Sequence, residues 1–80
     1  MSDAWPDQPP ALGTRVDVSG SGGSYNIRAL DGMYLVSWGS GLGSEIRPRS
    51  DGGFDVLITN GTASEEHTVA TWAEAGDIHP

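Results

Sequence analysis

Hydrophobic and polar residues alternate over residues 25–38, which is the pattern of β-strands with one buried face. Asp31-Gly32 divides this stretch, and Asp-Gly favours the type I′ turn of a two-residue hairpin loop. A turn at this point sets the register, which pairs Ala29 with Tyr34, Ile27 with Val36, and Tyr25 with Trp38. All six side chains fall on one face, so we predict a hairpin with one apolar side.

A second hairpin is predicted over residues 45–59, where Asp51-Gly52-Gly53 suits a three-residue loop with one glycine in the left-handed region. On the apolar face this register pairs Ser50 with Phe54, Pro48 with Val56, and Ile46 with Ile58. On the polar face it pairs Arg49 with Asp55, and Arg47 with Leu57. Since proline has no backbone N–H, Pro48 indicates that its strand lies at an edge or is bulged there.

Weaker signals flank the two hairpins. Residues 14–19 alternate, and we expect Val16 and Val18 to point toward the core. Residues 66–72 also alternate, but their pattern leaves open which face is buried. The one candidate helix, over residues 69–75, has room for one or two turns before Gly76 ends it.

The two hairpins resemble each other at an offset of about 20 residues. Such spacing indicates either a repeat with equivalent sites or a β-meander, in which hairpins recur regularly, and the meander is the simpler interpretation. We therefore predict an all-β domain: a small antiparallel barrel or roll of five to six short strands built from consecutive hairpins. The domain would cover residues 13–80, after a Pro-rich flexible tail formed by residues 1–12.

Composition places this 80-residue chain close to disordered sequences, because Leu, Ile, Val and Phe number only 15 and the net charge is -7. The 12 glycines and 9 serines are not scattered, however. They gather in the predicted turns and in two links, residues 19–24 and 39–44. We therefore expect a folded domain with a thin core and low stability.

Charge and residue types narrow the partners. The chain has no Cys and no Lys, and its four arginines face eleven acidic residues. This balance disfavours nucleic acids and anionic membranes, because both attract basic surfaces. No apolar stretch is long enough to span a membrane, and the N-terminal residues lack the features of a signal peptide. We expect a cytoplasmic protein of bacterial or phage origin, either a monomer or a homodimer, without a disulfide.

Three segments carry a resemblance to a known family. Residues 13–20 read Gly-Thr-Arg-Val-Asp-Val-Ser-Gly, residues 31–38 read Asp-Gly-Met-Tyr-Leu-Val-Ser-Trp, and residues 45–51 read Glu-Ile-Arg-Pro-Arg-Ser-Asp. Together, residues 13–51 resemble small actinobacterial SH3-like barrel proteins of unknown function, which combine a Gly-Asp-x-Val-Val-x-Gly strand, a Tyr-Leu-Val-Arg-Trp strand and a Pro-Gly-x-Asp turn. The resemblance implies an SH3-like barrel and no particular activity. This chain departs from the family after the Trp strand, where residues 39–44 replace Asp-Gly-His-Glu.

Catalytic and metal-binding patterns are poorly matched. Residues 39–43 are glycine-rich, but no helix is predicted after them and no Lys is present to bind phosphate. His67, with Glu65 or Asp77 as a partner, is the one candidate for a small hydrolase-like enzyme. The Glu65/His67 and Asp77/His79 pairs have metal-ligand spacing, although such spacing is common by chance. The sequence therefore favours no catalytic residue, no metal and no cofactor.

Aromatic residues are the remaining candidates for binding. Tyr25, Tyr34 and Trp38 share one predicted face, where they either fill the core or form a binding surface. With so few aliphatic residues we favour the core for these three, and we expect Trp72 and Trp5 to be more exposed. The predicted function is a non-enzymatic module that recognises a protein partner, and the acidic charge suits a basic one. The alternative is a small-molecule or glycan binder that uses the aromatic face.

Overall fold

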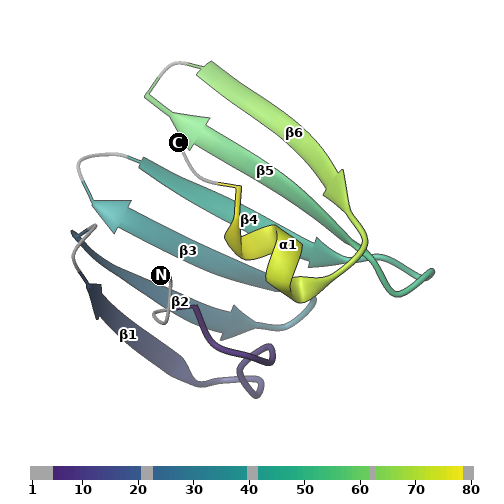
Figure 1. Ribbon diagram of the computed structural model, residues 1–80, viewed down its shortest axis with the longest axis horizontal. Helices are drawn as coiled ribbons and strands as arrows, with labels where there is room; N and C mark the ends of the chain where they lie inside the picture. The colour runs from purple at the N-terminus through teal and green to yellow at the C-terminus, as the bar shows by residue number, and fades with distance from the viewer. Residues whose placement is uncertain (1–4, 21–22, 40–41, 62, 79–80) are drawn as a thin grey trace.

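The fold is a single antiparallel sheet of six strands with one short helix, as Figure 1 shows. The computed structural model describes residues 5–20, 23–39, 42–61 and 63–78. Its strands are β1 (Arg15–Gly20), β2 (Gly23–Leu30), β3 (Met33–Gly39), β4 (Leu42–Pro48), β5 (Phe54–Asn60) and β6 (Ala63–Val69). Each strand pairs with the next along the chain. The prediction of an all-β domain built from consecutive antiparallel hairpins is therefore confirmed.

The sheet is open. Its strand order is β1-β2-β3-β4-β5-β6, so β1 and β6 form two separate edges and the expected closure into a barrel is not observed. The faint similarity between the hairpins reflects a meander in which every connection joins neighbouring strands.

The first predicted hairpin has the expected register. Ile27 pairs with Val36 and Ala29 with Tyr34, on either side of a turn in which Gly32 has a φ of 83°. A positive φ is the conformation that the Asp-Gly signal requires. The local sequence was sufficient to predict this register, because the turn and the alternating pattern favour the same pairing.

The second hairpin has its three-residue loop one position earlier than predicted. The backbone N–H of Arg49 donates to the carbonyl of Gly53 over 2.8 Å, and Gly52 has a φ of 91°. Residues 50–52 thus form the loop, and the pairs become Pro48 with Phe54, Arg47 with Asp55, and Ile46 with Val56. The predicted register was wrong by two residues, which leaves every side chain on its predicted face.

Gly53 explains this choice of loop. A Cβ on Gly53 would lie 2.6 Å from the carbonyl oxygen of Val69, so only glycine fits where β5 begins beside β6. The sequence offered two adjacent glycines for the left-handed position. Close contact with Val69 of β6 places Gly53 outside the loop, directly before β5.

After β6 the chain forms α1 (Trp72–Gly76), which lies across one face of the sheet and packs against β5 and β6 (Figure 1). Thr71 caps the helix: its side chain accepts from the backbone N–H of Glu74, whose side chain in turn accepts from the backbone of Thr71. This capping box ends the extended chain before Trp72. The predicted short helix is confirmed, whereas the prediction of a strand reaching Trp72 is wrong.

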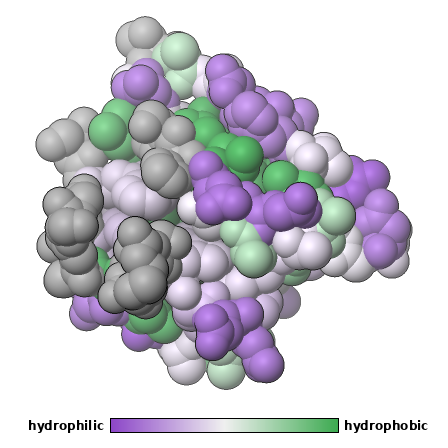
Figure 2. Space-filling view, in the orientation of Figure 1, coloured by the Kyte–Doolittle hydropathy of each residue, from purple (hydrophilic) through white to green (hydrophobic). Residues whose placement is uncertain are grey.

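The core lies between α1 and the sheet face that it covers, here called the inner face. Its most buried residues come from four neighbouring strands and are Ile27, Val36, Ile46 and Val56, each at most 2% exposed. Trp72 and Ala75 extend the same cluster from α1. Viewed from this side, patches of hydrophobic residues remain visible between hydrophilic ones (Figure 2). The core is thus a single layer of apolar side chains between α1 and the sheet, in agreement with the thin core that the composition predicts.

Candidate functional site

The aromatic residues predicted to bind ligands form one cluster on the inner face. Trp72 is at its centre, with ring centroids 4.8 Å from Trp5, 5.1 Å from Tyr34 and 5.7 Å from Phe54. Tyr25 joins the cluster through Trp5, and Trp38 through Tyr25. Trp72 is only 6% exposed, so the expectation that it is an exposed residue was wrong. The capping box directs its side chain onto the sheet.

The predicted tail is docked at Trp5. The Trp5 ring packs against the core cluster, and its Nε1 donates a hydrogen bond to the carbonyl of Trp72 over 3.1 Å. Leu12, which lies at the end of this segment, is 68% exposed. The N-terminal segment is therefore attached to the domain by its aromatic residue.

The opposite face of the sheet, here called the outer face, carries all four arginines. It is formed by the alternate strand positions whose neighbours are buried. From β1 to β5, two adjacent rows of cross-strand neighbours read Arg15, Arg28, Leu35, Glu45, Leu57 and Asp17, Asn26, Ser37, Gly43, Thr59. From the sequence we predicted no binding surface on this face, because the outer-face positions of the first hairpin are a mixture of polar and apolar residues.

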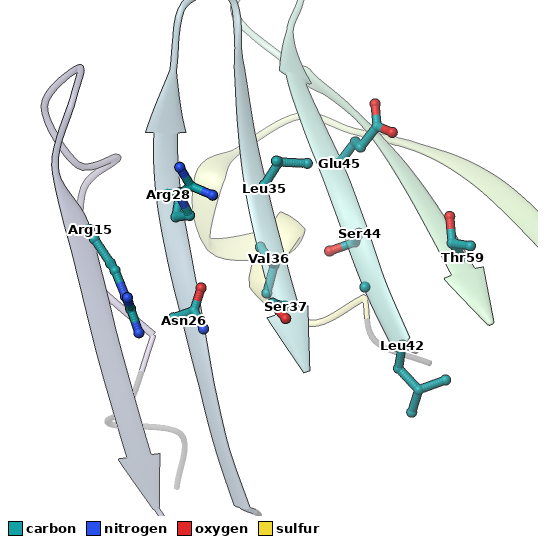
Figure 3. Close-up of a pocket in the computed structure, with 11 residues that line it drawn as sticks. Arg15, Asn26, Arg28, Leu35, Val36, Ser37, Leu42, Ser44, Glu45 and Thr59 are labelled. Carbon is teal, nitrogen blue, oxygen red and sulfur yellow. The ribbon is translucent and has the colours of Figure 1, made fainter. Parts of the chain in front are cut away.

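An open groove of about 460 Å³ lies on the outer face. Figure 3 shows its lining side chains on β1 to β5, with α1 behind the sheet. Small residues form its middle: Ser37 and Thr59 flank Gly43 in the register, and a Cβ on Gly43 would lie 3.1 Å from the carbonyl oxygen of Val36. Leu35 and Leu42 add apolar surface. The groove thus combines polar and apolar surface, with two arginines at the β1–β2 end.

Gly43 lies in residues 39–44, which we predicted to be a loop between the two hairpins. The structure places Leu42, Gly43 and Ser44 in β4, with Ser44 only 5% exposed on the inner face. A run of Gly and Ser has little intrinsic preference for a strand, so its pairing is imposed by β3 and β5 on either side. This pairing creates the groove, and no local sequence signal identifies it.

Arg28 differs from the other three arginines. Arg15 pairs with Asp17 at 3.0 Å, Arg47 with Glu45 at 3.1 Å, and Arg49 with Asp55 at 2.9 Å. No carboxylate in the described part of the chain lies within ion-pair distance of Arg28, which faces Arg15 directly across the β1–β2 ladder. Like charges at opposite cross-strand positions are destabilising. An anion at this end of the groove would relieve that repulsion.

Two carboxylates on the outer side are tuned by local hydrogen bonds. A bond from the Thr68 hydroxyl, followed by one from Arg49, holds the pKa of Asp55 below its ordinary value of 3.8. A backbone bond from Gly53, followed by the Arg49 side chain, lowers the pKa of Asp51 in the same way. When both acids are ionised, these contacts connect the β4–β5 loop with the adjoining part of β6.

The lowered pKa of Asp55 predicts that the protein loses stability in acid. A group whose pKa falls on folding contributes fully above its unfolded value of 3.8, and its contribution is lost as the pH falls through the lower folded value. We expect Asp55→Asn to destabilise the protein at neutral pH and to flatten the acid loss. Urea unfolding at a series of pH values measures both effects. Glu66→Gln, with the same change in net charge, is the control, and an unchanged pH slope in Asp55→Asn would contradict the assignment.

His67 lies on the edge strand β6, away from the groove. Its Nε2 is 2.5 Å from a Glu65 carboxylate oxygen, so one predicted pairing is present. Within the described residues no hydroxyl hydrogen-bonds to His67, and no three metal-binding side chains gather in one place. His79, named in the metal hypothesis, lies outside the described residues. The structure therefore brings His67 together with Glu65, and no nucleophile joins the pair among the described residues.

Comparisons of the chain with models of protein families, with curated proteins and with solved structures returned no match. Within the described part of the chain, no helix combines the length and the apolar character needed to cross a bilayer.

Proposed function

We propose that this protein is a non-catalytic binding module, which recognises an extended segment of a protein partner in the groove of the outer face. The observation that carries the proposal is the groove itself, with Arg28 at one end lacking an intramolecular carboxylate among the described residues. Asn26, Ser37 and Thr59 supply donors and acceptors that match the backbone groups of an extended peptide.

Arg28 favours a partner segment with a carboxylate. Its guanidinium offers a planar set of donors that a carboxylate accepts in pairs, and such charge-assisted hydrogen bonds are the stronger ones in proteins. A partner that is basic overall still suits the net charge of -7, because long-range attraction and one local carboxylate contact act at different distances.

Random peptides displayed on phage provide a direct test. We expect selection on the wild-type domain to enrich peptides with an acidic residue, and Ser37→Trp, which fills the groove, to abolish their binding. Arg28→Gln should weaken binding about tenfold, the loss of one charge-assisted contact. Isothermal titration calorimetry with the enriched peptides measures both changes.

Matched controls separate the groove from the rest of the surface. Ser50→Trp places the same side chain in the β4–β5 loop, and Arg49→Gln removes an arginine that does not line the groove. Both should bind the peptides like the wild type. Peptides that bind Ser37→Trp as well as the wild type would refute the proposal.

A further inference from the structure

Trp5 occupies a recess on the inner face that is made by distant parts of the chain. Its ring stacks on Trp72 with centroids 4.8 Å apart and planes inclined by 29°, and it lies 6.2 Å from the ring of Tyr25. Gly76 completes the recess, because a Cβ there would lie 2.5 Å from the Trp5 ring. The recess is thus formed by β2 and α1 and is shaped to one flat ring.

Two hydrogen bonds in opposite directions add chemical selectivity. Trp5 Nε1 donates to the carbonyl of Trp72 over 3.1 Å, and Trp72 Nε1 donates to the carbonyl of Pro6 over 2.9 Å. The first bond requires an indole N–H from the occupant, which Phe does not have and which Tyr carries at a different place. The second bond requires a carbonyl one residue further along. The recess therefore reads a tryptophan side chain and the backbone carbonyl of the residue after it.

Pro6 prepares this segment for binding. Proline fixes its own φ and restricts the preceding residue to extended conformations, so Trp5-Pro6 has few shapes to lose when it docks. Low conformational entropy is a general reason why proline-containing peptides are favoured ligands of aromatic recesses. The contacts made by Trp5 and Pro6 are thus those of a bound peptide, supplied by the same chain.

We propose that the recess formed by Trp72, Gly76 and Tyr25 is a peptide-recognition site for Trp-Pro segments, and that the chain's own Trp5-Pro6 occupies it as an intramolecular ligand. A Trp-Pro segment of another protein competes for the same recess. This inference is independent of the outer-face groove, which lies on the other side of the sheet. It also gives the predicted binding residues Tyr25, Trp72 and Trp5 a common role.

Tethering sets the strength of the competition. A segment on a short linker has an effective concentration in the millimolar range, so an outside peptide must overcome that advantage to enter the recess. The wild-type protein therefore admits only partners that bind more tightly than its own segment, or partners present at high local concentration. Removing the Trp5 ring should open the site.

The test uses the full chain with Trp5→Ala and an acetylated peptide with the sequence of residues 4–11. We expect isothermal titration calorimetry to show saturable binding to Trp5→Ala, and binding at least about tenfold weaker to the wild type because of the tethered competitor. A peptide in which the tryptophan is replaced by alanine should not bind. If Trp5→Ala is unfolded by circular dichroism, Trp5→Phe replaces it, since a ring without the indole N–H competes poorly.

Gly76→Ala is the variant that distinguishes recognition in the recess from adhesion elsewhere. Its added methyl group occupies the position of the Trp5 ring, while alanine favours the helical backbone more than glycine does. Combined with Trp5→Ala, it should abolish peptide binding without unfolding the protein. Absence of binding to folded Trp5→Ala, or equal binding with and without Gly76→Ala, would overturn the proposal. Neither result would affect the outer-face groove, whose own test uses other variants and other peptides.

Discussion

Trp72→Ala is expected to lower the free energy of unfolding by about 3–5 kcal/mol, the range for removing a buried tryptophan. Trp72 connects α1, the N-terminal segment and the sheet through its contacts with Trp5, Tyr34 and Phe54. A single core of this size rarely supplies more than about 3–5 kcal/mol in total. Most molecules of the variant should therefore be unfolded at 25 °C, even though all six strands are untouched.

Circular dichroism and urea unfolding measure this change, and Trp72→Phe is the informative companion. Phenylalanine keeps a ring in the cluster but loses the Nε1 that donates to Pro6. It should fall between the wild type and Trp72→Ala. A Trp72→Ala protein that unfolds at the wild-type urea concentration would show that α1 contributes little to stability.

Ile46→Ala is expected to cost about 2–5 kcal/mol, because the side chain is completely buried in the middle of the sheet. Ile46 pairs with Tyr34 on β3 and with Val56 on β5, so shortening it opens a cavity between the central strands. Val56 on β5 is also fully buried and close-packed, so it has little freedom to move into the space.

Leu57→Ala is the matched control for this prediction. Leu57 lies on β5 beside Val56 but points to the outer face, where it is only half-buried. We expect a clearly smaller loss of stability than for Ile46→Ala, with the slope of the urea transition unchanged in both. Equal losses would mean that both faces of the sheet are packed, contrary to the division between inner and outer face.

The first hairpin shows how much of the structure the local sequence can predict. Asp31-Gly32 and the alternation around it predicted both the turn and the pairing of Ile27 with Val36. Turn, pattern and strand propensity all depend on residues close together in the chain, and here they agree. The same kind of signal identified the face of Val18, which is only 6% exposed.

The second hairpin and α1 show where local sequence does not determine the structure. Two adjacent glycines left two loops possible, and the contact of Gly53 with Val69 selects between them. Residues 69–72 belonged both to an alternating stretch and to the candidate helix, and the Thr71–Glu74 capping box begins the helix at Trp72. The helix gains most of its stability from burying Trp72 and Ala75, which no local pattern reveals.

The candidate sites were less predictable than the fold. Tyr25, Tyr34 and Trp38 were predicted to share one face, whereas Trp72 and Trp5 were expected to be more exposed. The contact that brings Trp5 onto Trp72 joins opposite ends of the chain. Arg28 became notable only after the register placed it opposite Arg15 and the other arginines found carboxylates. Binding sites of this kind require several strands in register, so single segments carry little information about them.

The order of residues was enough to establish an acidic, cysteine-free, all-β chain in which most apolar residues lie on one face of short hairpins. These properties follow from charge, from turn chemistry and from a period of two residues, all of which are local. The open sheet was decided only by the tertiary structure. Contacts between distant residues place Gly43 at the middle of the groove and bring Trp5 onto Gly76. Such contacts depend on shape and burial in three dimensions, where residues with little local preference adopt the structure that their neighbours impose.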